Sequence, residues 1–157
     1  LATLTVQSVT MQDLSPEELF DLFNQNQDQS FFTIQFQTPT GFRSQGEYVL
    51  FPTLRLIFQS LMMKYGRLLE NREDIEEETL DYLTSHSRIT SYRMETSYFK
   101  VHGKKIPAFK GKLTFKITGP STLKAYANML LKFGEYAGLG MKTSLGMGGI
   151  ELEERKD

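Results

Sequence analysis

Apolar side chains alternate with polar ones in several short runs of this chain, and a period of two predicts β-strands. The clearest run covers residues 109–118, where Leu113, Phe115 and Ile117 should face a core while the residues between them face outward. Similar alternation predicts four further strands, over residues 3–9, 31–37, 89–101 and 149–153. Thr38-Pro39-Thr40-Gly41 is expected to end the second of these strands, and His102-Gly103-Lys104-Lys105 is expected to be a turn.

Apolar residues three and four positions apart predict helices between these strands. The expected helices cover residues 16–23, a long segment from Pro52 to Leu68, residues 76–83 and residues 122–137. Ser15 and Pro16 suit the N-cap and first position of a helix, which supports the start of the first one. Gly119-Pro120-Ser121 is expected to break the preceding strand and to cap the last helix.

From Phe31 onward the predicted order is strand, helix in two pieces, strand, strand, helix and strand. This order is the split βαβ arrangement of an α+β, ferredoxin-like (RRM-like) domain. We therefore expect a ferredoxin-like domain over residues 30–157, preceded by a strand-helix extension over residues 1–29. In the RRM the same topology binds RNA.

A cluster of glycines between the last predicted helix and the last predicted strand is the candidate functional segment. Gly-Leu-Gly at residues 138–140 and Gly-Met-Gly at residues 146–148 enclose five residues, among them Lys142, Thr143 and Ser144. Glycine permits a positive φ or a close approach of the backbone to a ligand. Exposed N–H groups beside a Lys suit a phosphate. Neither the Walker loop nor the dinucleotide fingerprint fits, because both run from strand to helix and this segment runs from helix to strand.

The charges of the chain are unevenly distributed, although the formal net charge is only −1. Residues 1–97 carry seven basic and fourteen acidic side chains, whereas residues 98–148 carry nine lysines and one acidic residue. A lysine-rich segment beside a glycine loop suits a nucleic-acid backbone. Lysines that only keep strand edges and helix faces soluble are the alternative interpretation.

Composition narrows the chemistry that the chain can perform. The sequence has no Cys and only two histidines, His86 and His102, so we expect no disulfide, no metal site and no cofactor. The absence of Cys also favours a reducing compartment, and we expect the chain to be cytoplasmic. No apolar run approaches the length of a membrane span, so no membrane partner is expected. The catalytic residues stay unassigned, since neither His has a partner in sequence.

The two Gly-apolar-Gly triplets with a basic residue between them resemble the glycine-rich loop of the repeat-associated mysterious proteins (RAMPs) of CRISPR systems. Within that superfamily the chain most resembles the endoribonuclease that cuts precursor CRISPR RNA within its repeats. Phe36-Gln37-Thr38-Pro39-Thr40-Gly41-Phe42-Arg43 is similar to the strand-end segment of the family's second domain. Phe109-Lys110-Gly111 fits a turn before a strand, and the whole resemblance covers about residues 30–153.

The resemblance implies a domain that binds CRISPR repeat RNA and supports metal-independent cleavage within the repeat. In the family the ribose 2′-OH attacks the adjacent phosphate, and the catalytic His usually lies in a first domain. That domain is expected to be missing here, because Leu1 begins the chain and suggests a fragment or processed product, so this chain alone should be inactive. The expected RNA-binding residues are Gly138, Gly140, Lys142, Thr143, Ser144, Gly146 and Gly148 in the loop, with Arg43, Lys110, Lys112 and Lys116 as a basic extension.

Two other functions fit the same residues. A non-catalytic RAMP subunit of a CRISPR effector complex would use the loop to hold processed guide RNA. A protein-interaction domain that binds no RNA would use the glycines only to pack a helix closely on the last strand. A homodimer or a CRISPR effector complex is the expected assembly.

Overall fold

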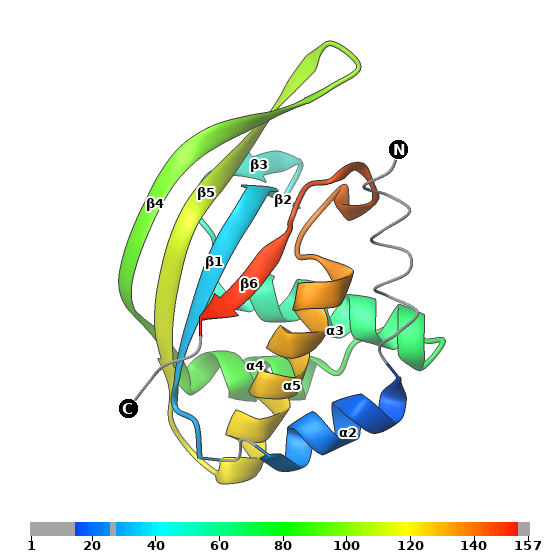
Figure 1. Ribbon diagram of the computed structural model, residues 1–157, viewed down its shortest axis with the longest axis vertical. Helices are drawn as coiled ribbons and strands as arrows, with labels where there is room; N and C mark the ends of the chain where they lie inside the picture. The colour runs from blue at the N-terminus through cyan, green and yellow to red at the C-terminus, as the bar shows by residue number, and fades with distance from the viewer. Residues whose placement is uncertain (1–14, 26–27, 154–157) are drawn as a thin grey trace.

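Four antiparallel strands in the order β4-β5-β1-β6 form the main sheet of the computed structural model, which describes residues 15–25 and 28–153 (Figure 1). The strands are β1 (Phe31–Thr40), β4 (Ser87–Val101), β5 (Lys104–Ile117) and β6 (Ile150–Glu153), and a separate hairpin joins β2 (Phe42–Ser44) to β3 (Glu47–Val49). The helices are α2 (Pro16–Gln25), α3 (Leu54–Leu69), α4 (Glu77–Ser85) and α5 (Ser121–Ala137), and Thr143–Leu145 form a short 3-10 helix, η1.

The order of the elements confirms the α+β, ferredoxin-like prediction. β1 and β4 are separated along the chain by α3 and α4, and β5 lies between these two strands in the sheet. After α5 the chain returns as β6 on the other side of β1. This is the split βαβ arrangement expected from residues 31–153.

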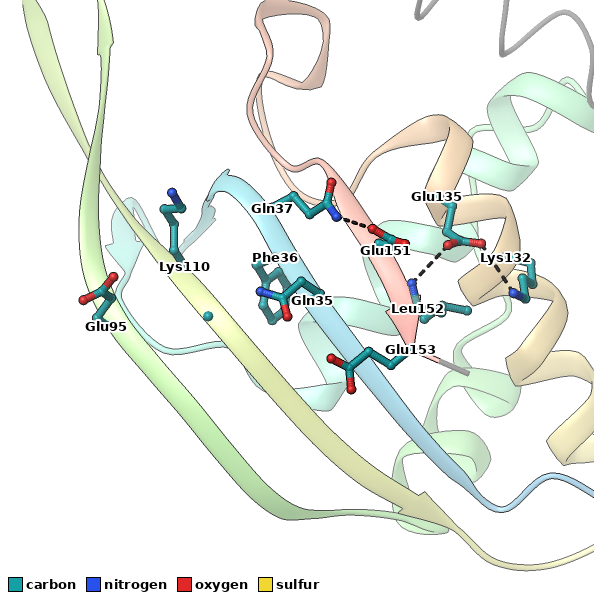
Figure 2. A pocket seen from close by; sticks show the side chains of 11 residues that line it. Gln35, Phe36, Gln37, Glu95, Lys110, Lys132, Glu135, Glu151, Leu152 and Glu153 are labelled. Atoms are coloured by element: carbon teal, nitrogen blue, oxygen red, sulfur yellow. Dashed lines mark hydrogen bonds and ion pairs between the residues drawn. The ribbon is translucent and has the colours of Figure 1, made fainter. Parts of the chain in front are cut away.

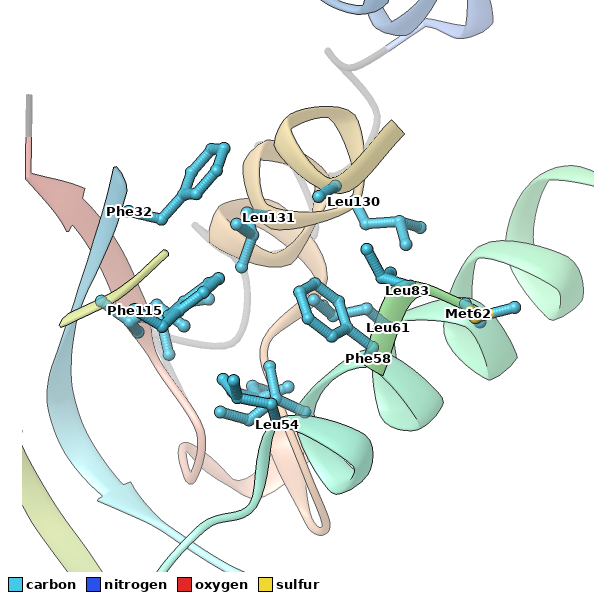
Figure 3. Close-up of a cluster of buried hydrophobic side chains, with 14 of the residues drawn as sticks. Phe32, Leu54, Phe58, Leu61, Met62, Leu83, Phe115, Leu130 and Leu131 are labelled. Carbon is cyan, nitrogen blue, oxygen red and sulfur yellow. The ribbon is translucent and has the colours of Figure 1, made fainter. Parts of the chain in front are cut away.

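The core lies between the sheet and the helices α3, α4 and α5 (Figure 3). Phe115 of β5 is fully buried, stacks on Phe32 of β1 at 5.6 Å between ring centroids, and meets Phe58 of α3 edge-on at 5.9 Å. Leu113 and Ile117 are also fully buried, so the prediction of inward-facing residues on this strand is confirmed. The opposite face of the sheet carries polar and charged side chains, which include Lys110, Lys112 and Lys116 of β5.

A capping hydrogen bond marks where α3 begins, and ion pairs connect α3 to α4. Thr53, rather than Pro52, is the N-cap of α3, because its side chain accepts a hydrogen bond from the Leu56 amide at 3.1 Å. Arg55 on α3 then makes ion pairs with Glu77 and Asp81 of α4, with the Glu77 pair at 2.9 Å. The acidic run is therefore largely an exposed face, partly paired with the arginines of α3.

Three predictions about where strands end or turn are wrong. β1 continues through Thr38 to Thr40, because Pro39 lies beside an irregularity in the register where its missing N–H is tolerated. β5 already begins at Lys104, so Lys104 and Lys105 are strand residues and only His102 and Gly103 form the turn, both at positive φ. Phe109-Lys110-Gly111 consequently lies within β5 and is not a turn.

Two further outcomes concern the ends of the domain and the β2–β3 hairpin. The helix expected at residues 16–23 is confirmed and extends to Gln25. The strand expected at residues 3–9 lies outside the described residues. The β2–β3 hairpin was not predicted, and its turn contains Gln45 and Gly46 at φ values of 53° and 81°.

Candidate functional site

The glycine-rich loop, residues 138–149, joins α5 to β6 and folds back on the end of β1 (Figure 1). Gly140 has a φ of +82°, and a Cβ at this position would lie 2.2 Å from the Gly41 carbonyl oxygen. Gly148 has a φ of +76°, and its Cβ would lie 2.1 Å from the Leu139 carbonyl oxygen. Glycine is therefore required at both positions, because backbone segments approach each other too closely for a side chain.

The structure gives each of the four predicted glycine amides an acceptor inside the chain. The Gly140 amide donates to Ser60 Oγ of α3 at 3.0 Å, and the Gly148 amide donates to the Pro39 carbonyl of β1 at 3.0 Å. The Gly138 amide donates to the Gly134 carbonyl, and the Gly146 amide donates to the Thr143 carbonyl. These amides therefore hold the loop on α5, α3 and β1.

The middle of the loop offers different backbone donors. Among the described residues, the amides of Lys142, Thr143 and Ser144 have no hydrogen-bond acceptor within the chain. Lys142 adopts the left-handed conformation with a φ of 55°, and the side chains of Lys142 and Ser144 are exposed. The short stretch between the two glycine triplets is thus the part of the loop whose free donors can bind an anion.

Thr143 fills the space that two of the glycines leave. Cβ atoms at Gly138 and Gly148 would lie 2.7 Å and 3.0 Å from the Thr143 methyl group, so larger residues at these positions would displace it. The Thr143 hydroxyl accepts a hydrogen bond from the ammonium group of Lys64 on α3 at 3.3 Å. The glycine pattern therefore fixes one hydroxyl of the loop against a cation of the neighbouring helix.

Lys64 was not predicted as a site residue. Its side chain is half-buried, and burial, with the charge of Arg67 as a smaller cause, lowers the pKa of Lys64 to about 8. The available sequence signal was slight: Lys64 lies four positions after Ser60, so both residues occupy one face of α3. Only the fold shows that this face meets the glycine-rich loop.

A second apolar cluster joins the glycine-rich loop to the β4–β5 hairpin, whose tip projects beyond β1 and β6 (Figure 1). Met147, of which 1% is exposed, is the loop residue at its centre. Its other members are Met141 of the loop, Phe99 and Val101 of β4, and Ile106 and Ala108 of β5. The hairpin thereby places Lys100, Lys104 and Lys105 on the element that packs beside the loop.

The predicted basic extension along β5 is interrupted by carboxylates. Lys112 makes an ion pair with Glu153 of β6, and Lys110 lies opposite Glu95 of β4. Figure 2 shows Lys110 lining an open pocket together with Glu95, Glu135, Glu151 and Glu153. Lys116 lies over the Phe31 ring, with its Nζ 5.4 Å from the ring centroid. The three lysines share one face of the sheet with acidic side chains, and the face is not a continuous cationic track.

Arg43 belongs to the β2–β3 hairpin and stabilises it. Its guanidinium donates to the Gly46 carbonyl at 3.1 Å and lies 4.9 Å from the centroid of the Tyr48 ring. Arg43 therefore lies near the end of β1, as expected, and its guanidinium contacts residues of its own hairpin.

The two histidines lie at the ends of secondary-structure elements. His86 follows α4 as its C-cap, and its Nδ1 lies 2.9 Å from the Tyr82 carbonyl oxygen. His102 is exposed in the tip of the β4–β5 hairpin, at a φ of 50°. Within residues 15–25 and 28–153 no three His, Asp or Glu side chains are grouped so that they could hold a metal ion. None of the described helices is long and apolar enough to cross a membrane.

Comparison with known proteins gives one consistent family. Residues 34–150 match the model of the family described as CRISPR-associated endoribonuclease Cas6. A Streptococcus thermophilus protein of that name is 66% identical over 157 residues, which are 100% of this chain and 65% of the relative. A Mycobacterium tuberculosis protein of the same name is 38% identical over 122 residues, which are 78% of this chain and 38% of the relative.

A solved structure of a Cas6 product complex shares 25% sequence identity with the chain. It superimposes with a TM-score of 0.72 over 91% of this chain and 60% of the solved chain. The chain therefore spans about two thirds or less of the length of these three proteins.

Proposed function

The chain belongs to the CRISPR-associated endoribonuclease Cas6 family, and from this membership we propose that it binds the repeat RNA of CRISPR precursor transcripts and supports cleavage within the repeat. The middle of the glycine-rich loop is the proposed phosphate site. The backbone amides of Lys142, Thr143 and Ser144 and the Lys142 ammonium group would donate hydrogen bonds to the phosphate oxygens. The glycine amides hold the loop in shape.

One observation carries this proposal: the free donors of the loop lie together at residues 142–144, and the exposed side chain of Lys142 adds a positive charge beside them. Lys142 and Ser144 are exposed beside the amides that have no acceptor among the described residues. The adjacent β4–β5 hairpin adds three lysines. An anion at this loop would therefore meet backbone donors at short range and the positive charge of Lys142 beside them.

The acid–base chemistry of cleavage needs groups that the glycine-rich loop does not contain. Attack of the ribose 2′-OH on the adjacent phosphate requires a base for the hydroxyl proton, an acid for the leaving 5′-oxygen and a cation for the phosphorane. His86 is engaged at the end of α4, and His102 lies at a hairpin tip. We propose that the base and acid come from the further domain expected from the family resemblance, and that this chain binds and orients the RNA.

Replacing Lys142 with Ala is expected to weaken binding of a CRISPR repeat RNA several-fold. It should also lower the slope of log affinity against log salt concentration by about one, because one phosphate contact is lost. Fluorescence anisotropy at a series of salt concentrations measures both quantities. Lys124→Ala is the matched control, since Lys124 lies in the first turn of α5, at the end of the helix opposite the loop.

The outcome separates the proposal from its alternatives. If Lys142→Ala and Lys124→Ala bind with the wild-type affinity and salt slope, the loop is architectural and the protein-interaction alternative takes its place. If the loop binds RNA but a form of the protein extended to the length of its relatives does not cut the repeat, the non-catalytic RAMP subunit is the better description. A homodimer or a CRISPR effector complex, and a cytoplasmic location, stay predictions.

A further inference from the structure

Lys64 is a half-buried cation that lacks an anion in the described part of the chain. Its ammonium group has three donors, and one of them is used by the hydrogen bond to Thr143 Oγ1 at 3.3 Å. Among residues 15–25 and 28–153, no carboxylate lies within ion-pair distance of it, whereas Arg55, Arg67, Arg72, Lys112 and Lys132 all have acidic partners. A cation removed from water without a partner is costly, so its retention needs a reason.

We propose that Lys64 is a second phosphate ligand of the glycine-rich loop, which contacts the RNA from the α3 side while Lys142 contacts it from the exposed side. This inference rests on the proposed function, because the anion is an RNA phosphate seated at residues 142–144. The free donors of Lys64 would bind the same phosphate or the next one along the backbone. Thr143 orients the ammonium group, and the glycines that make room for Thr143 thereby also position Lys64.

The proposal explains three features together. It supplies the missing counter-charge of Lys64, it accounts for a hydroxyl at position 143, and it accounts for the space at Gly138 and Gly148 that Thr143 fills. A purely structural Lys64 leaves the missing counter-charge unexplained, because its single bond to Thr143 does not compensate for the desolvation that lowers its pKa to about 8.

Lys64→Met is expected to weaken repeat-RNA binding roughly 10- to 100-fold, which is the range for losing a hydrogen-bonded ionic contact. The same variant should melt at a higher temperature than the wild type in the absence of RNA, because a desolvated charge is replaced by an apolar side chain of similar length. A residue that serves only the fold would show the opposite change in melting temperature. Arg72→Met is the matched control: it removes the same charge just beyond α3, from an exposed residue paired with Asp74.

RNA binding should also depend on pH, because Lys64 titrates. Arg67 on α3 is the charged residue that acts on Lys64, and Lys142 on the loop adjoins its hydrogen-bond partner Thr143 in sequence. Since the pKa of Lys64 is lowered to about 8, the free protein loses this proton as the pH rises through that value. In the complex, the bound phosphate would keep Lys64 protonated. Wild-type affinity should therefore fall roughly tenfold between about pH 7 and about pH 9, and Lys64→Arg should remove most of this fall.

The outcomes distinguish this inference from the proposed function. If Lys142→Ala weakens binding while Lys64→Met matches Arg72→Met in affinity, RNA sits at the loop without Lys64 and the inference is overturned. If Lys64→Met melts at a lower temperature and its affinity loss disappears under conditions where it is fully folded, Lys64 is structural. If neither Lys142→Ala nor Lys64→Met changes RNA binding, the proposed function itself has failed.

Discussion

Replacing Gly140 with Ala is expected to lower the free energy of unfolding by about 3–5 kcal/mol and to abolish ordered packing of the glycine-rich loop. The new Cβ would lie 2.2 Å from the Gly41 carbonyl oxygen, a backbone atom that cannot rotate away. The same carbonyl accepts the Met141 amide at 3.0 Å, and the Gly140 amide donates to Ser60. Moving the two backbone segments apart would therefore also break the hydrogen bonds that attach the loop to the rest of the domain.

Gly46→Ala is the matched control for this variant. Gly46 has a φ of +81°, nearly the value of Gly140, but no atom lies within 4 Å of a Cβ built there. Only the backbone strain of a positive φ remains, which costs about 1–2 kcal/mol. Urea unfolding of both variants separates strain from close approach. Equal losses in the two variants would show that Gly140 does not serve the contact with Gly41.

Replacing Met147 with Gln is expected to cost about 2–4 kcal/mol of stability, because a buried apolar side chain becomes a polar one without hydrogen-bond partners. Met147 is 1% exposed and packs with Ile106 and Ala108 of the β4–β5 hairpin. Its loss should loosen the hairpin and the loop together. RNA affinity is expected to decrease although no charge has changed, since the free donors of residues 142–144 would no longer be held in place.

Leu145→Gln provides the comparison for Met147→Gln. Leu145 lies two positions earlier in the same loop, and 46% of it is exposed, so the substitution should change stability by less than about 0.5 kcal/mol. The two variants have the same net charge and the same new side chain. Thermal unfolding and RNA binding are measured on both. If Leu145→Gln lowers stability and RNA affinity as much as Met147→Gln, any polar substitution in the loop is harmful. The second apolar cluster then has no special role.

Much of the fold could be predicted because the core signal is periodic and local. Leu113, Phe115 and Ile117 alternate with polar residues, and the structure buries all three. The β2–β3 hairpin escaped prediction because its strands have three residues each and its Gln45-Gly46 turn lacks the usual Asn or Asp. Short strands carry too little alternation to be recognised.

The site was only partly predictable for a different reason. The positions of the glycines could be read from the spacing of the triplets, but the acceptors of their amides could not. Gly140 donates to Ser60 and Gly148 donates to Pro39, across long separations in sequence. Lys64 looks like an ordinary helical lysine until α3 is placed against the loop. Long-range packing, which no local pattern records, thus decides which donors are free.

We propose that RNA phosphate binds at residues 142–144 of the glycine-rich loop. The most direct measurement follows the backbone amide resonances of the isotope-labelled chain while a CRISPR repeat RNA is added. The claim predicts that the largest shifts fall on the amides of Lys142, Thr143 and Ser144, while those of α4, which carries the acidic run, stay unchanged. If the RNA binds and these three amides do not move, or if the largest shifts lie on the lysine face of β5, the phosphate site is elsewhere and the claim is contradicted.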